Sequence, residues 1–197
     1  NPAGMDVENW PALGIPPDFA AQQERVIAAF ARMGIITTCS CTPYLTGNVP
    51  HFGEHIAWAE SSAVCYANSI LGARTNREGG PSALAAALTG FTPAYGMHLD
   101  ENRWPTVTAQ VAAPLSGTIA FGALGKALGE RLQGSAGARL PYITGISQAS
   151  LEELKSLCAS LATYGGAAMF HMQWITPEAG LYSPPAIVLT ITQAERG

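Results

Sequence analysis

Apolar residues recur at helical spacing between Phe19 and Met33. This pattern predicts an amphipathic helix that is capped by Asp18 and stopped by Gly34. The short apolar run that follows, Ile35–Thr38, predicts a buried strand. The N-terminal part of the chain therefore predicts one helix followed by one strand.

Prolines and glycines break up the stretch Cys39–Gly53, which predicts an irregular loop. Loops in such positions commonly carry functional residues. The Ala-rich stretch Glu54–Leu71 has no Gly or Pro and predicts a helix. A second polar loop is expected at Gly72–Pro81, followed by a short helix at Ser82–Leu88.

Two further helices are predicted in the C-terminal half. The first covers Thr118–Leu132, where regularly placed glycines indicate a close approach of another backbone. The second opens with a capping box formed by Ser150 and Glu153, continues with a stripe of Leu residues, and ends at Gly165.

Strand-like apolar segments separate these helices at Thr106–Ala112, Ala167–Phe170 and Ala186–Thr192. Helices that alternate with short apolar strands indicate an α/β layered fold. No internal repeat or low-complexity segment divides the chain, so a single α/β region over residues 1–197 is expected.

The amino-acid composition limits the kinds of partner that this protein is expected to bind. Only 12% of the residues are charged, against roughly 25% in typical soluble proteins, so we expect additional chain or a partner to cover part of the surface. The net charge of -4 and the scattered Lys and Arg residues predict no nucleic-acid partner. Polar residues interrupt every long apolar stretch, so no membrane association is expected. Four irregularly spaced cysteines favour a reducing, cytoplasmic compartment.

The densest group of reactive side chains lies between Cys39 and Ser62, where two thiols, two histidines and two carboxylates occur. One interpretation is that the cysteines are buried and the histidines are ordinary surface groups. A second is zinc hydrolysis, because His51, Glu54 and His55 spell H-x-x-E-H. Gly53 speaks against a shared helical face for the two imidazoles.

A third interpretation is an iron or iron–sulfur site. Cys39 and Cys41 could supply one or two thiolates from a flexible loop, and the other ligands would come from elsewhere. Cys65 and Cys158 fall within predicted helices and are expected in the core.

A long run of the sequence carries a specific resemblance. The run that begins CTPYLTGNVPHFGEHIAWAESS, from Cys41 to Arg103, resembles the signature region of the aconitase X family. PYITGI at Pro141–Ile146, the LEELKSLCAS helix and FHMQWITPEA at Phe170–Ala179 resemble further blocks in the same order. The chain thus resembles the central part of the catalytic large domain.

The resemblance implies an incomplete, layered aconitase-like α/β domain. It also implies a dehydratase (hydro-lyase) that acts on a small hydroxy acid. The favoured substrate is cis-3-hydroxy-L-proline, because the Ala-rich chain is typical of a bacterial protein, and mevalonate 5-phosphate is the alternative. A non-catalytic piece that folds against its partner is a further alternative.

The implied cofactor is iron or an iron–sulfur cluster, 2Fe–2S or 4Fe–4S, which acts as a Lewis acid on the leaving hydroxyl while a base removes a proton. Cys41 is the ligand carried over from the family, and the remaining ligands lie outside this chain. The implied protein partner is a small swivelling domain or a small subunit.

Candidate site residues come from the two polar segments. An arginine there could bind a carboxylate through two hydrogen bonds. Alternatively, the arginines pair with Glu60 or Glu78. His98 and His171 are expected to be structural, and Asp100, Glu101 and Arg103 to form a solvated turn or an interface. The expected catalytic residues are His55, Glu60, Ser61 and Ser62, with Glu54 also a candidate, and the expected substrate-binding residues are Asn48, Arg74, Thr75, Asn76, Arg77 and Glu78.

Overall fold

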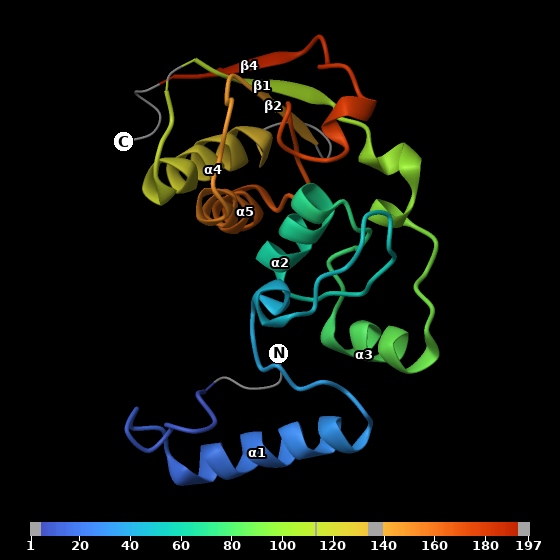
Figure 1. Cartoon of the computed structure of the whole chain (residues 1–197), viewed down its shortest axis with the longest axis vertical. Helices are drawn as coiled ribbons and strands as arrows, with labels where there is room; N and C mark the ends of the chain where they lie inside the picture. Colours follow the sequence, from blue (N-terminus) through green and yellow to red (C-terminus); the bar gives the residue numbers. More distant parts are fainter. Residues whose placement is uncertain (1–4, 113, 134–139, 193–197) are drawn as a thin grey trace. The chain divides into compact units, whose positions relative to one another are not determined.

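The computed structural model describes residues 5–112, 114–133 and 140–192. The chain forms two compact units, Asn1–Val49 and Pro50–Gly197 (Figure 1). The first unit is mainly one helix with its flanking loops, and the second contains the sheet and the other α-helices. The expectation of one continuous α/β region stays a prediction. Over the described ranges, no helix is both long and apolar enough to cross a membrane.

Helix α1 (Pro17–Arg32) confirms the helix predicted for the first unit, but it begins differently. Pro16 is extended and Pro17 lies in the first turn, where its fixed φ suits the helix and its missing N–H is not needed. Asp18 therefore lies inside the first turn, near the positive end of the helix dipole, and does not cap it. Gly34, with a φ of 81°, follows the helix end as predicted.

The strand predicted at Ile35–Thr38 is wrong, because this segment is not paired with any strand in the described structure. The Thr38 amide instead bonds back to the Ile36 carbonyl at 3.1 Å. An apolar run forms a strand only where a neighbouring strand takes up its backbone polar groups. The loop that follows is irregular as predicted and contains the short 3-10 helix η1 (Pro43–Thr46).

The helix predicted over residues 54–71 forms only in its C-terminal part. There, α2 (Ser61–Tyr66) runs directly into the π-helix η2 (Ala67–Leu71). The preceding residues are extended and pair with Arg74, whose amide donates to the Glu54 carbonyl at 2.8 Å. Long-range backbone pairing thus outweighs the weak helix preference of an Ala-rich stretch.

The short helix α3 (Gly80–Thr89) confirms the one predicted at Ser82–Leu88 and begins slightly earlier. Two 3-10 helices follow, η3 (Gly96–His98) and η4 (Asp100–Arg103). Together they lead the chain from α3 into the sheet.

The sheet confirms the α/β prediction. Its four strands are all parallel in the order β3-β2-β1-β4, and α4 and α5 lie side by side on one face of it (Figure 1).

The predicted strand at 167–170 is wrong, since the strand there begins only at His171. β2 lies in PYITGI, for which the hydrophobic pattern predicted no strand. The bounds are β1 (Val107–Val111), α4 (Thr118–Gln133), β2 (Pro141–Thr144), α5 (Leu151–Gly165), β3 (His171–Met172), the 3-10 helix η5 (Ala179–Leu181) and β4 (Val188–Ile191).

The two sheet-covering helices approach each other closely through glycines, as predicted. A Cβ added at Gly125 would lie 2.9 Å from the Leu157 carbonyl oxygen, and one added at Gly129 would lie 2.7 Å from the Gly165 nitrogen. The predicted capping box at the start of α5 is also present, formed by Ser150 and Glu153.

The core lies between α2, α4, α5 and the sheet, and it contains both helical cysteines. Cys65 and Cys158 are buried, which confirms their expected place in the core. Burial raises the pKa of the Cys158 thiol well above its usual value, and a contact with Cys65 raises it further. The Cys158 thiol is therefore protonated and inert at neutral pH.

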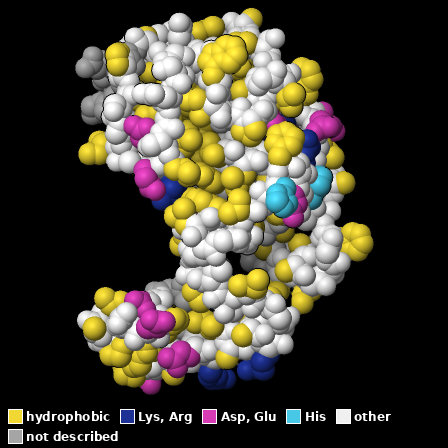
Figure 2. All heavy atoms as spheres, viewed as in Figure 1, with side chains coloured by type: hydrophobic (Ala, Val, Ile, Leu, Met, Phe, Trp, Pro, Cys, Tyr) yellow, Lys and Arg dark blue, Asp and Glu magenta, His cyan; other side chains and the backbone are white. Residues whose placement is uncertain are grey.

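Large apolar side chains also reach the surface. Figure 2 shows many apolar and few charged side chains on the face in view. Ile119, Trp174 and Phe91 are 87%, 85% and 79% exposed. This surface agrees with the low charge content of the sequence.

Candidate functional site

The two polar segments singled out from the sequence lie side by side in the second unit. His55 forms a parallel bridge with Arg74. Farther along the same two segments, the Trp58 amide donates to Thr75 Oγ1 at 3.1 Å, and the Glu78 amide donates to the Trp58 carbonyl at 3.0 Å. The structure therefore brings His55 next to the loop of residues 74–78.

A buried asparagine fixes this loop to the π-helix. Asn68 accepts from the Thr75 amide at 3.0 Å and donates to the Thr75 carbonyl at 2.8 Å, much as a neighbouring strand would. Thr75 is fully buried, and its hydroxyl donates to the Asn76 carbonyl at 2.7 Å. The side chain of Thr75 thus holds the shape of the loop. The short π-helix η2, which carries Asn68, is also of a kind that is frequent at functional sites.

Asn76 holds the segment that carries His98. Its side chain donates to the Tyr95 carbonyl at 3.1 Å and accepts from the Met97 amide at 2.8 Å. Gly96 packs against it with a φ of 59°, and a Cβ there would lie 2.1 Å from Asn76 Oδ1. Only glycine fits this turn, because both the backbone conformation and the close contact exclude a side chain.

The two arginines of the loop differ in their surroundings. Arg74 is only 20% exposed; it pairs with the Asp100 carboxylate and donates to the His98 carbonyl at 3.1 Å. The alternative in which it pairs with Glu60 or Glu78 is therefore wrong. Arg77 is exposed and has no ion pair within the described ranges. Its guanidinium is available to an anion from solution.

The carboxylates of Glu60 and Glu78 both organise helix starts. Glu60 caps α2 by accepting from the Ala63 amide at 2.8 Å, and it also accepts from the Ser62 hydroxyl at 2.5 Å. Glu78 accepts from the Ser82 hydroxyl at 2.7 Å. Ser61, the first residue of α2, is half-buried.

His55 and His98 form a close pair. Their Nδ1 atoms are 2.9 Å apart, and the two ring planes are inclined by only 15° with centroids 5.1 Å apart, so the rings face each other edge to edge. His55 is exposed and His98 is buried. A shallow hollow of about 280 Å³ opens beside them, lined also by Phe91, Pro93 and Ala94.

Burial and the charge of neighbouring groups keep His98 neutral. Burial lowers the pKa of His98, the nearby His55 lowers it further, and the Glu78 carboxylate partly opposes this shift. Arg103 and Arg74 also lower the pKa of His98. The pair therefore has an uncharged inner imidazole at neutral pH.

The helical form of the H-x-x-E-H motif is absent. The segment from His51 to His55 contains a turn and a bridge, and the Glu54 carboxylate accepts from the His51 amide at 2.8 Å. In the described part of the chain, no three His, Cys, Asp or Glu side chains are placed to hold a metal ion. The zinc interpretation loses the helical geometry on which it depended.

Two expected site residues, Cys41 and Asn48, belong to the first unit, where both are exposed on the loop. Cys39, two residues before Cys41, has a φ of 50°. An exposed loop thiol fits one thiolate ligand of an iron centre. Since the described residues provide no complete ligand set, further ligands for such a centre would have to come from outside them.

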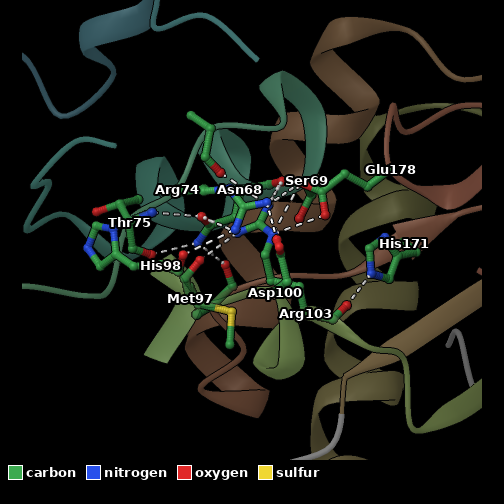
Figure 3. A network of polar contacts seen from close by, with 12 residues as sticks. Asn68, Ser69, Arg74, Thr75, Met97, His98, Asp100, Arg103, His171 and Glu178 are labelled. Carbon is green, nitrogen blue, oxygen red and sulfur yellow. Dashed lines mark hydrogen bonds and ion pairs between the residues drawn. The ribbon is translucent and has the colours of Figure 1, made fainter. Parts of the chain in front are cut away.

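A buried arginine, which sequence reasoning placed in a turn or an interface, anchors this region (Figure 3). Arg103 is fully buried and donates through Nε and Nη2 to the Glu178 carboxylate, at 3.0 and 2.6 Å. It also donates to the carbonyls of Met97, Asn68 and Ala73. The solvated-turn prediction is therefore wrong for Arg103, although Asp100 and Glu101 are exposed.

His171 completes this network. Its Nε2–H donates to the Arg103 carbonyl at 2.8 Å, so its buried Nδ1 is a bare lone pair. Burial lowers the pKa of His171 and favours its uncharged form, and its bond to the Arg103 carbonyl agrees with the structural role expected for it. Sequence reasoning missed Arg103 and Glu178; for Asn68, the signal was a polar residue inside an apolar stretch, where a buried partner is required.

Two family models together match almost the whole chain. The model of the aconitase X first domain matches residues 1–101, and that of the aconitase X second domain matches residues 105–196. This chain belongs to the aconitase X family.

Relatives and a solved structure agree with this assignment. The aconitase X chain is 50% identical over 184 residues to the phosphomevalonate dehydratase large subunit of Methanothermobacter thermautotrophicus, covering 93% of this chain and 45% of the relative. It is 37% identical to the cis-3-hydroxy-L-proline dehydratase of Hypocrea jecorina, covering 89% of this chain and 30% of the relative. Thermococcus kodakaraensis aconitase X (holo-form) matches with a TM-score of 0.84 and 43% identity, over 92% of this chain and 46% of that one. The chain therefore spans about half the length of the archaeal relative and of the solved structure.

The family match shows that the buried Arg103 lies between two domains. Arg103 lies in the short stretch between the two matched aconitase X domains. Its bonds reach Met97, Asn68 and Ala73 of the first matched region and Glu178 of the second. This single side chain thus joins the loop of the candidate site to the sheet domain of aconitase X.

Proposed function

We propose that this chain is part of a dehydratase that removes water from a small hydroxy acid, with mevalonate 5-phosphate as the substrate. The main support for this proposal is the sequence identity between this chain and its curated relatives. Four relatives named phosphomevalonate dehydratase large subunit are 46–50% identical and a fifth is 37% identical, whereas the two named cis-3-hydroxy-L-proline dehydratase are 37% and 36% identical. This ranking reverses the preference drawn from the Ala-rich composition. Cis-3-hydroxy-L-proline remains the second candidate substrate.

The proposed site uses the exposed groups of the two polar segments. Arg77 binds an anionic group of the substrate, either a carboxylate or a phosphate, since both match its paired N–H donors. His55 contacts the reacting part of the substrate. Thr75, Asn76 and Glu78 hold the loop in place, and Arg74 fixes it to the segment that carries His98.

The helix start at α2 has a supporting role in this proposal. Glu60 and Ser62 are bonded to each other and hold the first turn of α2. Ser61 remains as a half-buried hydroxyl that can approach a substrate. Asn48 is exposed on the loop of the first unit and is proposed as a further substrate contact.

Cys41 is proposed as one thiolate ligand of iron or of a 2Fe–2S or 4Fe–4S cluster. When bound, such a centre supplies a Lewis acid for the leaving hydroxyl. The other ligands would come from the remainder of the enzyme. A small subunit is the proposed protein partner, because the archaeal relatives are named as large subunits, and the cytoplasm is the proposed compartment.

The test is an assay of the complete enzyme that contains this chain, co-expressed with its small subunit under anaerobic conditions. Both substrates are supplied in parallel, and iron and sulfide are measured on the same samples. We expect faster dehydration of mevalonate 5-phosphate. Cys41→Ala should lose iron and activity, whereas Cys65→Ala, in the buried core, should keep the iron.

Each alternative has its own outcome in this experiment. Faster turnover of cis-3-hydroxy-L-proline would establish the second candidate substrate. Iron that is retained in Cys41→Ala would remove this cysteine from the ligand set. No turnover of either substrate by an iron-loaded complex would favour the non-catalytic alternative.

A further inference from the structure

The contact between His55 and His98 restricts where protons can lie. Two imidazole Nδ1 atoms 2.9 Å apart are at hydrogen-bonding distance, so one of them carries a proton and the other offers a lone pair. Two lone pairs, or two N–H groups, would repel each other at this separation. Either His98 donates to His55, or His55 donates to His98.

The second nitrogen of His98 decides between these arrangements. His98 Nε2 is buried and has no hydrogen-bond partner within the described residues. A neutral imidazole carries one proton, so if His98 accepted at Nδ1, its Nε2 would have to be a buried N–H without an acceptor. Orphaned buried N–H groups are rare because they lose the full hydrogen bond to water. A bare lone pair at Nε2, with the proton on Nδ1, is the less costly arrangement.

A second histidine of the same molecule, His171, also has a buried ring nitrogen that is a bare lone pair. Nε2 of His171 faces a carbonyl that can only accept, so its buried Nδ1 is necessarily a bare lone pair. Glu78 Oε1 is also buried and unpartnered across the described ranges, but no direct hydrogen bond joins it to His98 Nε2. The cations Arg74 and Arg103 disfavour a second proton on His98.

The position of the proton on His98 also determines which nitrogen of the exposed His55 carries a proton. If His98 donates from Nδ1, the Nδ1 of His55 is an acceptor, and a neutral His55 carries its proton on Nε2. That Nε2–H belongs to an exposed ring beside the shallow hollow lined by Phe91, Pro93 and Ala94. A fixed N–H donor beside apolar side chains suits a carboxylate oxygen on a small carbon skeleton.

We propose that His98 is a positioning residue that fixes His55 as a neutral hydrogen-bond donor for a substrate carboxylate, rather than as a base. Removal of the proton next to a carboxylate places negative charge on the carboxylate oxygens, and a neutral imidazole N–H stabilises that charge without itself losing a proton. This role rests on the proposed dehydratase function. A base other than His55 takes the proton from the carbon, and this proton and the hydroxide that leaves the neighbouring carbon together make up the released water.

The first test reads the protons directly and does not depend on activity. In the ¹⁵N-histidine-labelled chain, we expect a scalar coupling across the hydrogen bond between the two Nδ1 atoms, with the bonded proton on His98 and the other proton on His55 Nε2. His98→Leu should abolish the coupling. A proton found on His55 Nδ1, or no coupling between the rings in the folded chain, would overturn the inference.

The second test uses the complete enzyme with its small subunit. His98→Leu should lower kcat by at least about tenfold with little change in KM, because a misplaced tautomer presents a lone pair to the developing charge. His98→Asn should keep most of kcat, since its amide N–H can replace the Nδ1 donor. Equal kcat in the Leu variant and the wild type would refute the catalytic role. A wild-type complex without dehydratase activity would refute the proposed function instead, while the coupling would still decide the proton positions.

Discussion

Arg103 is a buried cation whose hydrogen bonds join segments that are far apart in the sequence. Its guanidinium lies fully buried against Glu178 and three backbone carbonyls. A buried ion pair contributes little net stability, but the loss of one partner leaves an uncompensated charge. At the residue scale, this side chain is the clearest weak point of the second unit.

We expect Arg103→Leu to lower the free energy of unfolding by about 3–5 kcal/mol, because Glu178 and the carbonyls lose their partner. Denaturant unfolding followed by circular dichroism measures this. The matched control is Lys155→Ala, which removes the exposed pair with Glu152 and should cost under about 1 kcal/mol. Equal losses in the two variants would show that Arg103 is not the anchor described above.

Arg77 is the residue-scale prediction for activity. Replacement by Gln in the complete enzyme should lower kcat/KM by about 10- to 100-fold, which corresponds to the loss of a charge-assisted hydrogen bond of roughly 1.5–3 kcal/mol. Steady-state kinetics measures the effect. Arg25→Gln, an exposed arginine on α1, is the control and should have no effect. Unchanged kcat/KM in Arg77→Gln would exclude this arginine from substrate binding.

At the scale of elements, the crossing of α4 and α5 depends on the absence of side chains. The backbone of Gly129 lies against that of Gly165, and Gly125 lies against Leu157, so the helix axes can approach closely. An added methyl group would meet backbone atoms, which cannot move aside without separating the helices. Helix propensity alone would favour Ala at both positions.

We therefore expect Gly129→Ala to destabilise the chain by about 1–3 kcal/mol, as overpacking does in a core. Gly80→Ala, in the first turn of α3 with open space around the added Cβ, should be neutral or slightly stabilising. Thermal unfolding of the two variants provides the comparison. A stable Gly129→Ala variant would mean that the two helices can separate without cost.

At the scale of the whole molecule, two buried histidines make stability depend on pH. The pKa values of His98 and His171 are both lowered from about 6.5, mainly by burial. The unfolded chain therefore binds protons more readily than the folded chain does. Stability is unaffected by these groups above their ordinary pKa and falls as the pH drops below about 6.5 towards the lowered values.

His171→Gln should flatten this loss of stability, because the amide can still donate to the Arg103 carbonyl but cannot titrate. The free energy of unfolding measured between pH 7 and pH 5 tests the prediction. His51→Gln, at an exposed position, is the control and should retain the wild-type slope. An identical slope in His171→Gln and in the wild type would contradict the assignment.

Features that depend on neighbours along the chain could be predicted before the fold was known. The capping box at Ser150 and the helix end at Gly34 were predicted, because each is set by local backbone geometry. The glycines of α4 predicted a close approach of another backbone, but the fold determines that this backbone belongs to α5. The motifs of the Cys41–Arg103 run also carried the family resemblance, since a long run of specific residues can be recognised from the sequence alone.

Features that depend on partners distant in the sequence could not be predicted in this way, because they are set by the fold. The stretch from Glu54 is extended, against its local helix preference, because its backbone pairs with Arg74. Ile35–Thr38 has a strand-like pattern but no partner strand in the described structure. The burial of Arg103 requires Glu178, and the pairing of His55 with His98 requires a turn built on Asn76. Hydrogen bonds between distant segments fix these positions, and no local pattern encodes them.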